Sequence, residues 1–196
     1  PFAPNLARGV LDTLAEHQGV DFVDDTEEEP GRILHEVRFG GLGASSFSRA
    51  LRYSGAADAT PLFVMLIAEA ARWGLDERVI ARLLPHVDRA IGWMRGVGDA
   101  DRDGWIEYQR KTPAGLANQG WRDSWDGVRY RNGSVAEAPI ALADVQAYAY
   151  AALEGRAYLA RLMEGDAAAA PFEHAARELK DRFTESFWLS EPGWYA

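Results

Sequence analysis

The stretch TPLFVMLIAEAARWG, residues 60–74, decides the fold class of this chain. Its large apolar side chains recur at intervals of three and four residues, which places them on one face of an α-helix: Leu62, Phe63, Leu66, Ile67, Ala70 and Trp73. Thr60 and Pro61 supply a capping residue followed by a proline at the first helical position, and Gly74 supplies a stop. The pattern therefore predicts a helix that begins at Thr60 and ends near Gly74.

Helical spacing continues on both sides of this stretch, and it predicts four further helices. They cover residues 4–19, 76–95, 139–165 and 171–188. Pro85 lies inside the second of these, so we expect a kink or a break there. Long loops are predicted for residues 20–59, 97–138 and 189–196, with a weak alternation at 33–39 that predicts at most a short strand. The prediction is an all-α protein whose helices form the scaffold and whose loops carry function.

The length and composition of the chain limit the kinds of protein and of binding partner that are possible. A chain of 196 residues can bury a sizeable core, and no low-complexity segment or linker divides it, so residues 1–196 are expected to belong to one domain without an internal boundary. The net charge of −9 argues against nucleic acid or an anionic membrane as partner and suits a neutral, polyhydroxyl substrate. The absence of cysteine excludes disulfides and thiolate chemistry. Without an apolar run of membrane-spanning length or a signal peptide, we expect a cytoplasmic protein.

The stretch NQGWRDSWD, residues 118–126, holds the strongest chemical signal. It places the carboxylates of Asp123 and Asp126 three residues apart and next to Trp121 and Trp125. An apolar aromatic wall disfavours the charged form of a carboxyl group, raises its pKa and can stack on a sugar ring, as a proton donor in a sugar site requires. The alternative interpretation is that the tryptophans belong to the core and that the Asp-Ser pair caps a helix.

The segment NQGWRDSWDG resembles the signature of the bacterial amylo-α-1,6-glucosidase, or glycogen-debranching-like, glycoside hydrolases. Four more segments agree in the order that this family shows them: EPGRILHEVR at 29–38, YSGAADATPLF at 53–63, DRDGWIEYQR at 101–110 and PIALADVQAYAY at 139–150. The resemblance implies an (α/α)6 toroid, the six-hairpin fold of these glycosidases. Five predicted helices are too few for six hairpins, so the chain is expected to be part of one such barrel.

The resemblance also assigns the catalytic residues. It places the general acid at Asp123, with Asp126 as the second choice, in an inverting acid/base mechanism. Side chains three residues apart in one turn lie too close for water and a sugar to fit between them, so these two are not expected to form the acid/base pair. The family's base is a glutamate well downstream, which implies a base beyond Ala196 and an isolated chain that is inactive.

Further residues are expected to bind substrate. By resemblance, Asp58 is a ligand for sugar hydroxyls, since a carboxylate can accept two hydrogen bonds at once; its alternative role is a turn or cap hydrogen bond. Tyr53 is a candidate stacking platform. The other candidates for the lining of the site are Glu107, Gln109, Gln119, Trp121 and Trp125.

The sequence predicts neither a cofactor nor a metal. Residues 99–104 place aspartates at alternate positions before a glycine, which opens like a calcium loop. Arg110 stands where such a loop needs a bidentate glutamate, so the pattern favours a hydrogen-bonded Asp-Gly turn. Asp144 stands where many relatives carry glutamate, and we assign it no role.

Two functions remain open at this point. The first is a fragment of a glycoside hydrolase of the debranching or α-glucosidase type that acts on α-glucans or α-glucoside oligosaccharides. The second is a non-catalytic carbohydrate-binding or scaffold module on an α/α toroid. Both imply a carbohydrate partner, with no nucleic acid and no membrane, and both imply self-association if apolar helix faces are exposed.

Overall fold

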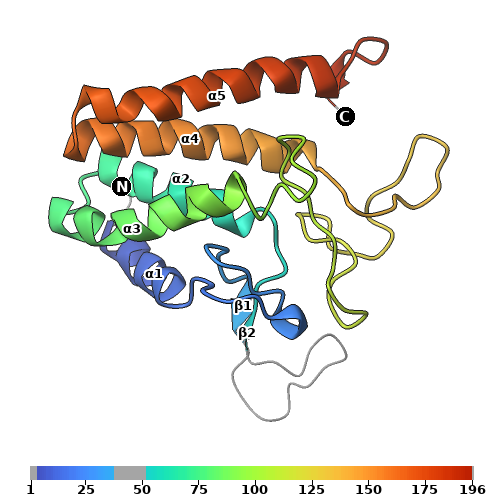
Figure 1. Cartoon of the computed structure of the whole chain (residues 1–196), viewed down its shortest axis with the longest axis horizontal. Helices are drawn as coiled ribbons and strands as arrows, with labels where there is room; N and C mark the ends of the chain where they lie inside the picture. The colour runs from blue at the N-terminus through green and yellow to red at the C-terminus, as the bar shows by residue number, and fades with distance from the viewer. Residues whose placement is uncertain (1–3, 38–51, 196) are drawn as a thin grey trace.

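A computed structural model of the chain describes residues 4–37 and 52–195 (Figure 1). The predicted strand at 33–39 extends beyond these residues at positions 38 and 39. Five α-helices form the scaffold: α1 (Pro4–Glu16), α2 (Ala59–Arg72), α3 (Glu77–Met94), α4 (Ala143–Met163) and α5 (Asp166–Phe187). The all-α prediction and the five helices are confirmed. In the described part of the chain, no helix combines the length and the apolar character that crossing a membrane requires.

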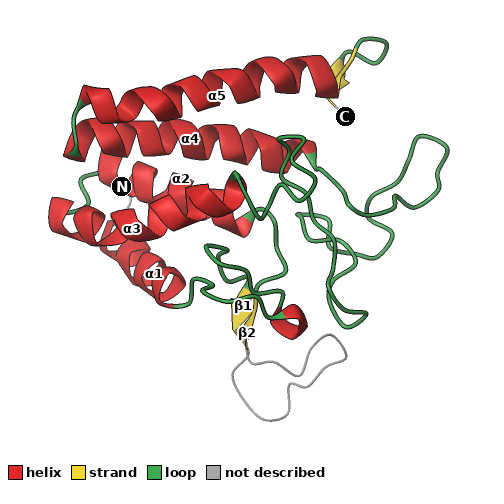
Figure 2. Ribbon diagram, in the orientation of Figure 1, coloured by secondary structure: helices red, strands yellow, loops and turns green. Residues whose placement is uncertain are grey.

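The other regular elements are short (Figure 2). A 3₁₀ turn, η1, covers Asp24–Thr26. Strand β1 (Glu36–Val37) pairs antiparallel with β2 (Arg52–Tyr53), with Glu36 opposite Tyr53. At the far end of the chain β3 (Trp188–Leu189) pairs antiparallel with β4 (Trp194–Tyr195). The weak alternation in the sequence thus marks β1, which falls within the predicted stretch.

Successive helices fold back on one another, and the long loops gather at one end of the helical stack (Figure 1). Helix α4 packs against α2, α3 and α5, and α1 packs against α2 and α3. Local signals explain the reversals: Gly74 ends α2 and Gly165 separates α4 from α5, both at positive φ angles (88° and 99°) that glycine adopts without strain. The Asp76 side chain begins α3 by accepting a hydrogen bond from the Arg78 N–H at 2.7 Å.

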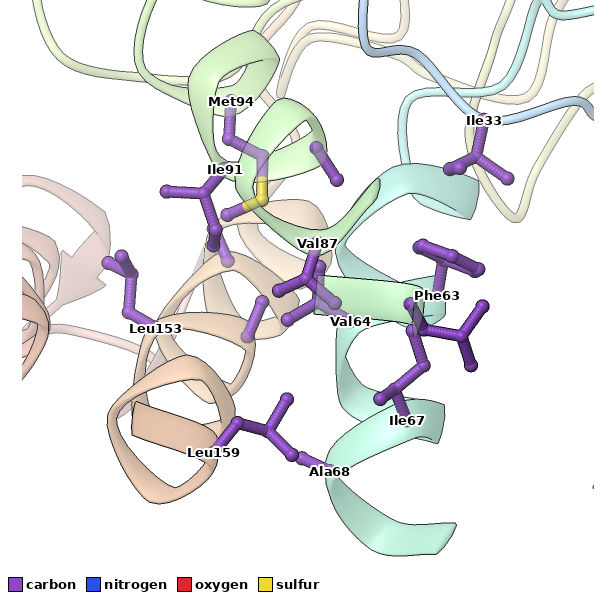
Figure 3. Close-up of a cluster of buried hydrophobic side chains, with 14 of the residues drawn as sticks. Ile33, Phe63, Val64, Ile67, Ala68, Val87, Ile91, Met94, Leu153 and Leu159 are labelled. Carbon is purple, nitrogen blue, oxygen red and sulfur yellow. The ribbon is translucent and has the colours of Figure 1, made fainter. Parts of the chain in front are cut away.

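The core lies between α2, α3 and α4 (Figure 3). Phe63, Val64 and Ile67 of α2 face Val87 and Ile91 of α3, all of them buried. Leu153 and Leu159 of α4 and Ile33 of the first long loop complete this cluster. Each fully buried side chain of this size contributes about 1.5–3 kcal/mol relative to an exposed one, so this layer is the main source of stability.

Three predicted helix starts were wrong, and α1 ends at Glu16 and not at Gly19. Helix α4 begins at Ala143 and not at Pro139, because Ile140 exchanges two backbone hydrogen bonds with Tyr108 (both 3.1 Å) and stays extended. Helix α5 begins at Asp166, so Pro171 lies inside it near the start, where one backbone hydrogen bond is lost.

The third boundary concerns α2, which begins at Ala59, so Thr60 does not cap it. The Thr60 hydroxyl instead accepts a hydrogen bond from the Ile33 N–H at 3.0 Å and satisfies a buried backbone group of the first loop. Helix α3 also continues through Pro85 without a break, because the buried face on both sides of the proline holds its two halves together.

Some apolar surface remains uncovered. Helix α5 buries only Ala169 and Ala176. Large apolar side chains on the other helices are also exposed: Leu6, Val10, Leu62, Leu66 and Leu162. Self-association through these faces remains a prediction.

A buried ionic network holds the loops to the helices. The Arg32 side chain is only 3% exposed. Its guanidinium donates to the Gln119 Oε1 atom at 2.6 Å, to the Glu27 carbonyl at 3.1 Å and to the Glu29 carboxylate at 3.4 Å. It also lies over the ring of Trp93 on α3, at 5.4 Å from the centroid, and the Trp93 indole N–H donates to Glu29 at 2.8 Å.

Lys111 also joins this network, from the same loop between α3 and α4 that carries Gln119. Its backbone N–H donates to Glu27 at 2.7 Å, and its ammonium group lies 3.3 Å from Glu29. Burial lowers the pKa of Arg32, and the two carboxylates oppose that shift by favouring the charged guanidinium. The charges are therefore mutually compensated, and loss of one leaves the others buried without a partner.

The close approach of α2 and α4 depends on Gly155. A Cβ atom added there would lie 2.9 Å from the Cβ of Ala68, closer than such atoms normally approach. We predict that Gly155→Ala lowers the free energy of unfolding, because an overpacking cost of about 1–3 kcal/mol exceeds the gain in helix propensity. In the control Gly92→Ala, the added Cβ of α3 meets no atom within 4 Å, so stability should rise by up to about 1 kcal/mol. Urea unfolding of both variants tests this, and equal stabilisation by both would contradict the tight packing.

Removal of the buried guanidinium should be far more damaging than removal of an exposed one. We predict that Arg32→Ala costs about 3–5 kcal/mol of stability, since Glu27 and Glu29 remain buried without their cation. The control is Arg131→Ala, because Arg131 is 92% exposed and its pair with Glu191 should contribute little. Arg32→Met combined with Glu29→Gln should recover part of the loss. Thermal and urea unfolding give the values, and similar losses for Arg32→Ala and Arg131→Ala would disprove the role of the network.

Candidate functional site

The loop at residues 118–126 is anchored at its start and projects at its end. Asn118 and Gln119 are buried. The Asn118 Oδ1 atom accepts from the Tyr108 hydroxyl at 2.9 Å, and the Gln119 carbonyl accepts from the Ala57 N–H at 2.7 Å. The residues that follow are exposed, with Trp121 at 82% and Trp125 at 71%. The anchored amides therefore fix where the tryptophans and Asp123 emerge.

Asp123 borders a cavity of about 460 Å³ together with Tyr53 and Trp125. The cavity is also lined by His35, Glu36, Arg110 and Leu116. The Tyr53 ring is 3% exposed, and its hydroxyl accepts from the Leu116 N–H at 2.8 Å. Burial raises the pKa of Tyr53 further above its ordinary value. The prediction that Tyr53 is a stacking platform was wrong, because so buried a ring leaves no free face for a sugar. Segments far apart in the sequence thus supply an acidic group and two aromatic walls to one hollow.

Glycines allow Tyr53 to lie where it does. A Cβ atom at Gly55 would fall 2.1 Å from the Tyr53 hydroxyl oxygen, and one at Gly115 would fall 3.3 Å from it. The first contact leaves no room for any side chain at position 55. The small residues in the segment at 53–63 therefore have a packing reason independent of any resemblance.

The two carboxylates of the loop have different surroundings. Asp126 pairs with Arg129 at 2.8 Å, and Arg129 also donates to the Gly133 carbonyl at 2.9 Å. Asp123 has no hydrogen bond or ion pair to any described residue. Among the described contacts, Asp123 is therefore the carboxylate of this pair that is available to a ligand.

The remaining candidates do not share the Asp123 cavity. Trp121 lies on a second cavity of about 340 Å³, which is also lined by Arg122, Arg129, Leu142 and Asp144. A third cavity of about 190 Å³ is lined by Glu107, Gln109 and Gln119, with Arg32 and Lys111. Asp58 and Asp126 line none of these three. The structure therefore does not gather the predicted site residues into one cleft.

Asp58 and Asp144 are close enough to influence each other electrostatically, although the sequence separates them widely. Asp58 precedes α2 and Asp144 is the second residue of α4. Burial raises the pKa of Asp58, and the negative charge of Asp144 adds to the rise, while backbone N–H groups and His35 oppose it. Burial, again helped by Asp144, raises the pKa of Tyr108 to about 12. Asp144 was given no role from the sequence, because no local spacing links it to Asp58; the link depends on the packing of α4 against α2.

The predicted Asp-Gly turn is confirmed. Asp99 accepts from the Gly104 N–H at 3.0 Å, Asp101 from the Asp103 N–H at 3.0 Å, and Asp103 from the Trp105 N–H at 2.9 Å. One oxygen of each carboxylate lies within 4.8 Å of the others, and this is the described group that could hold a cation. The turn bonds alone account for the loop geometry.

Glu107 lies close to this turn. Burial raises the pKa of Glu107, and the charges of Asp101, Asp103 and Asp99 raise it further. Its Oε2 atom is buried without a hydrogen-bond partner, so Glu107 belongs to the wall of the third cavity and not to the hollow around Asp123.

Comparison with protein-family models and with curated proteins gave no match for this chain. The family resemblance therefore remains an expectation that rests on the quoted motifs.

The coupling of the two aspartates makes a testable prediction about protonation. Removal of the Asp144 charge in Asp144→Asn should lower the pKa of Asp58, and removal of the imidazole in His35→Ala should raise it. NMR titration of the Asp58 carboxyl carbon measures both changes, and an unchanged Asp58 pKa in Asp144→Asn would contradict the proximity of the two groups.

The same shift has a consequence for stability. Because the folded protein holds the Asp58 proton more tightly than the unfolded chain, the contribution of Asp58 to the free energy of unfolding is fully present below the ordinary carboxyl pKa. It decreases as pH rises through the raised pKa. In Asp58→Asn this part of the pH dependence should be absent.

Proposed function

We propose that this chain is part of the catalytic domain of a glycoside hydrolase of the debranching or α-glucosidase type. Its substrates would be α-glucans or α-glucoside oligosaccharides, and Asp123 would be the general acid. The observation that carries the proposal is the placement of Asp123, without a hydrogen-bond or ion-pair partner among the described residues, on a cavity between Tyr53 and Trp125. These three residues come from two of the segments on which the family resemblance rests.

The cavity has the composition that a neutral sugar needs. Its volume of about 460 Å³ falls within the range of small-molecule sites. The exposed Trp125 ring offers a face for the apolar side of a sugar, and the lining carries both signs of charge, through Arg110 on one hand and Glu36 and Asp123 on the other. No strong field of one sign results, so a polyhydroxyl ligand without charge fits better than an anion or a cation.

The chemistry proposed for Asp123 is proton donation. In its protonated form it would donate to the glycosidic oxygen as the bond from that oxygen to the anomeric carbon breaks. A water molecule on the opposite face would attack that carbon and lose its proton to a second carboxylate. In an inverting enzyme the two carboxyl groups lie about 6.5–9.5 Å apart. The resemblance places this base downstream, and Glu36 is a second carboxylate of the described chain on the same cavity.

The proposed fold is an (α/α)6 toroid of which this chain forms a part. It is supported by successive helices that fold back on one another and by long loops collected at one end of the stack (Figure 1). In toroids of this kind the loops at one end surround the site. The Asp123 cavity is lined by residues of such loops and of the β1–β2 hairpin.

A non-catalytic carbohydrate-binding module is the second candidate. It is favoured by the engagement of Asp126 with Arg129, which leaves the loop with one available carboxylate. Such a module would bind sugar through Trp125 and the polar groups of the same cavity without hydrolysing it. The two proposals therefore agree on binding and differ on turnover.

Binding is tested with maltotetraose and isomaltose by calorimetry. We predict that Trp125→Ala weakens binding by about tenfold, equivalent to about 1.4 kcal/mol, because it removes the stacking face. Asp123→Asn should leave binding nearly unchanged, since the amide keeps the shape and one acceptor oxygen. Trp194→Ala is the matched control, because Trp194 is 64% exposed but lies on β4, away from this cavity. Equal effects of the two tryptophan variants would disprove the assigned cavity.

Turnover separates the two candidates. We expect the chain of residues 1–196 to release no glucose above the uncatalysed rate. These residues do not include the glutamate that the family resemblance implies as the catalytic base. In an active enzyme that contains this chain and further barrel helices, Asp123→Asn should lower kcat by about 10²–10⁴-fold, whereas Asp126→Asn should have a smaller effect. Turnover unaffected by Asp123→Asn would refute the acid assignment. Turnover by residues 1–196 that is lost in both Asp123→Asn and Glu36→Gln would instead identify Glu36 as the second carboxylate.

A further inference from the structure

The loop at residues 120–127 separates two cavities. Asp123, Ser124 and Trp125 line the cavity of about 460 Å³ described above. Residues of the same loop, Trp121 and Arg122, line the neighbouring cavity of about 340 Å³. The loop is therefore a partition, with an exposed tryptophan at each of the two hollows.

The second cavity contains polar groups that the protein itself does not use. Asp144 accepts one hydrogen bond, from the Val145 N–H to its Oδ1 atom at 3.0 Å, and its other carboxylate oxygen has no partner among the described residues. Arg122 likewise makes no hydrogen bond or ion pair to a residue of the described chain. A carboxylate oxygen, a guanidinium and the face of Trp121 thus border one volume.

The charge of this lining selects a class of ligand. Arg129 is neutralised by Asp126, and the remaining charges of Arg122 and Asp144 are opposite. A phosphate or carboxylate would face the repulsion of Asp144, and a cation that of Arg122. A neutral molecule with several hydroxyl groups can donate to Asp144, accept from Arg122 and place its apolar face on Trp121.

We propose that the cavity between Trp121, Arg122 and Asp144 is a second sugar subsite that binds one hexosyl unit of an oligosaccharide independently of the Asp123 cavity. Asp144 accepts sugar hydroxyl hydrogens there, and Trp121 provides the stacking face. The proposal rests on the proposed carbohydrate function, but it concerns a cavity that does not contain Asp123.

The test follows the two tryptophans separately. The indole N–H signals of Trp121 and Trp125 are assigned in NMR spectra through Trp121→Phe and Trp125→Phe, and the chain is titrated with maltotetraose. We expect both signals to shift. Asp144→Asn should weaken the binding reported by Trp121 by at least fivefold and leave the Trp125 titration unchanged.

Asp144→Asn keeps the oxygen that accepts from Val145, so the start of α4 should remain folded. Arg131→Gln is the control for the general effect of a surface charge, and Arg122→Gln should weaken the Trp121 titration in the same way as Asp144→Asn.

The outcomes distinguish this inference from the proposed function. A shift of Trp125 alone overturns the second subsite and retains the Asp123 cavity as the sugar site. A shift of Trp121 alone supports the subsite and refutes the Asp123 cavity as a sugar site. No shift of either signal overturns both. A Trp121 titration that Asp144→Asn leaves unchanged overturns the subsite as proposed.

Discussion

The burial of the Arg32 guanidinium is the constraint on which the loop half of this molecule depends. A guanidinium cannot lose its proton at any ordinary pH, so burial obliges the chain to surround it with acceptors and carboxylates. The structure meets this requirement with Glu27 and Glu29 from the loop between α1 and α2 and with Gln119 from the loop between α3 and α4. Trp93 of α3 adds a ring face. One charge thus joins two loops to a helix, in addition to the core contacts that Ile33 and Tyr108 make from the same loops.

This arrangement explains why an exposed loop can hold a defined geometry. Residues 121–125 are exposed and have few contacts, yet Gln119, two positions before them, is 1% exposed and bonded through its side chain and its carbonyl. The part of the loop that projects into solvent is therefore short. A site needs such an arrangement, since a sugar must reach the tryptophans while their backbone stays in place.

The sequence was most informative where a single element determines its own structure. Helical spacing located all five helices, because burial of one face against the core needs only that spacing. It was wrong at the start of α4, where the backbone pairing of Ile140 with Tyr108 competes with a proline signal, and at Thr60, whose hydroxyl serves a distant N–H group. Tertiary contacts of this kind leave no local pattern.

The candidate site likewise combines residues that their own segments indicate with an arrangement that depends on contacts between distant segments. Asp123 and Trp125 could be chosen from the alternation of aromatic and acidic residues in their segment, whereas Tyr53 was chosen only through the family resemblance of the segment at 53–63. Their meeting at one cavity could not be predicted from spacing, and neither could the separation of Trp121 from Trp125 by the loop that carries both. The role of Gln119 in bonding Arg32 was also invisible, because its partner lies in another loop.

The loop composition explains why this separation is stable. Gly120 lies against Leu142, and a Cβ atom there would fall 2.2 Å from the Leu142 Cδ1 atom. At the other end, the Gly127 N–H closes a turn with the Ser124 carbonyl at 2.8 Å. A glycine at each end thus lets the loop pass close to the segment before α4 and turn back on itself. Between these two points Asp123 and Trp125 line one hollow, and Trp121 and Arg122 line the other, which Asp144 also borders. Any acid/base pair that includes Asp123 must accordingly draw its second carboxylate from the Asp123 side of the partition, which excludes Asp144 from that role and leaves it available to bind.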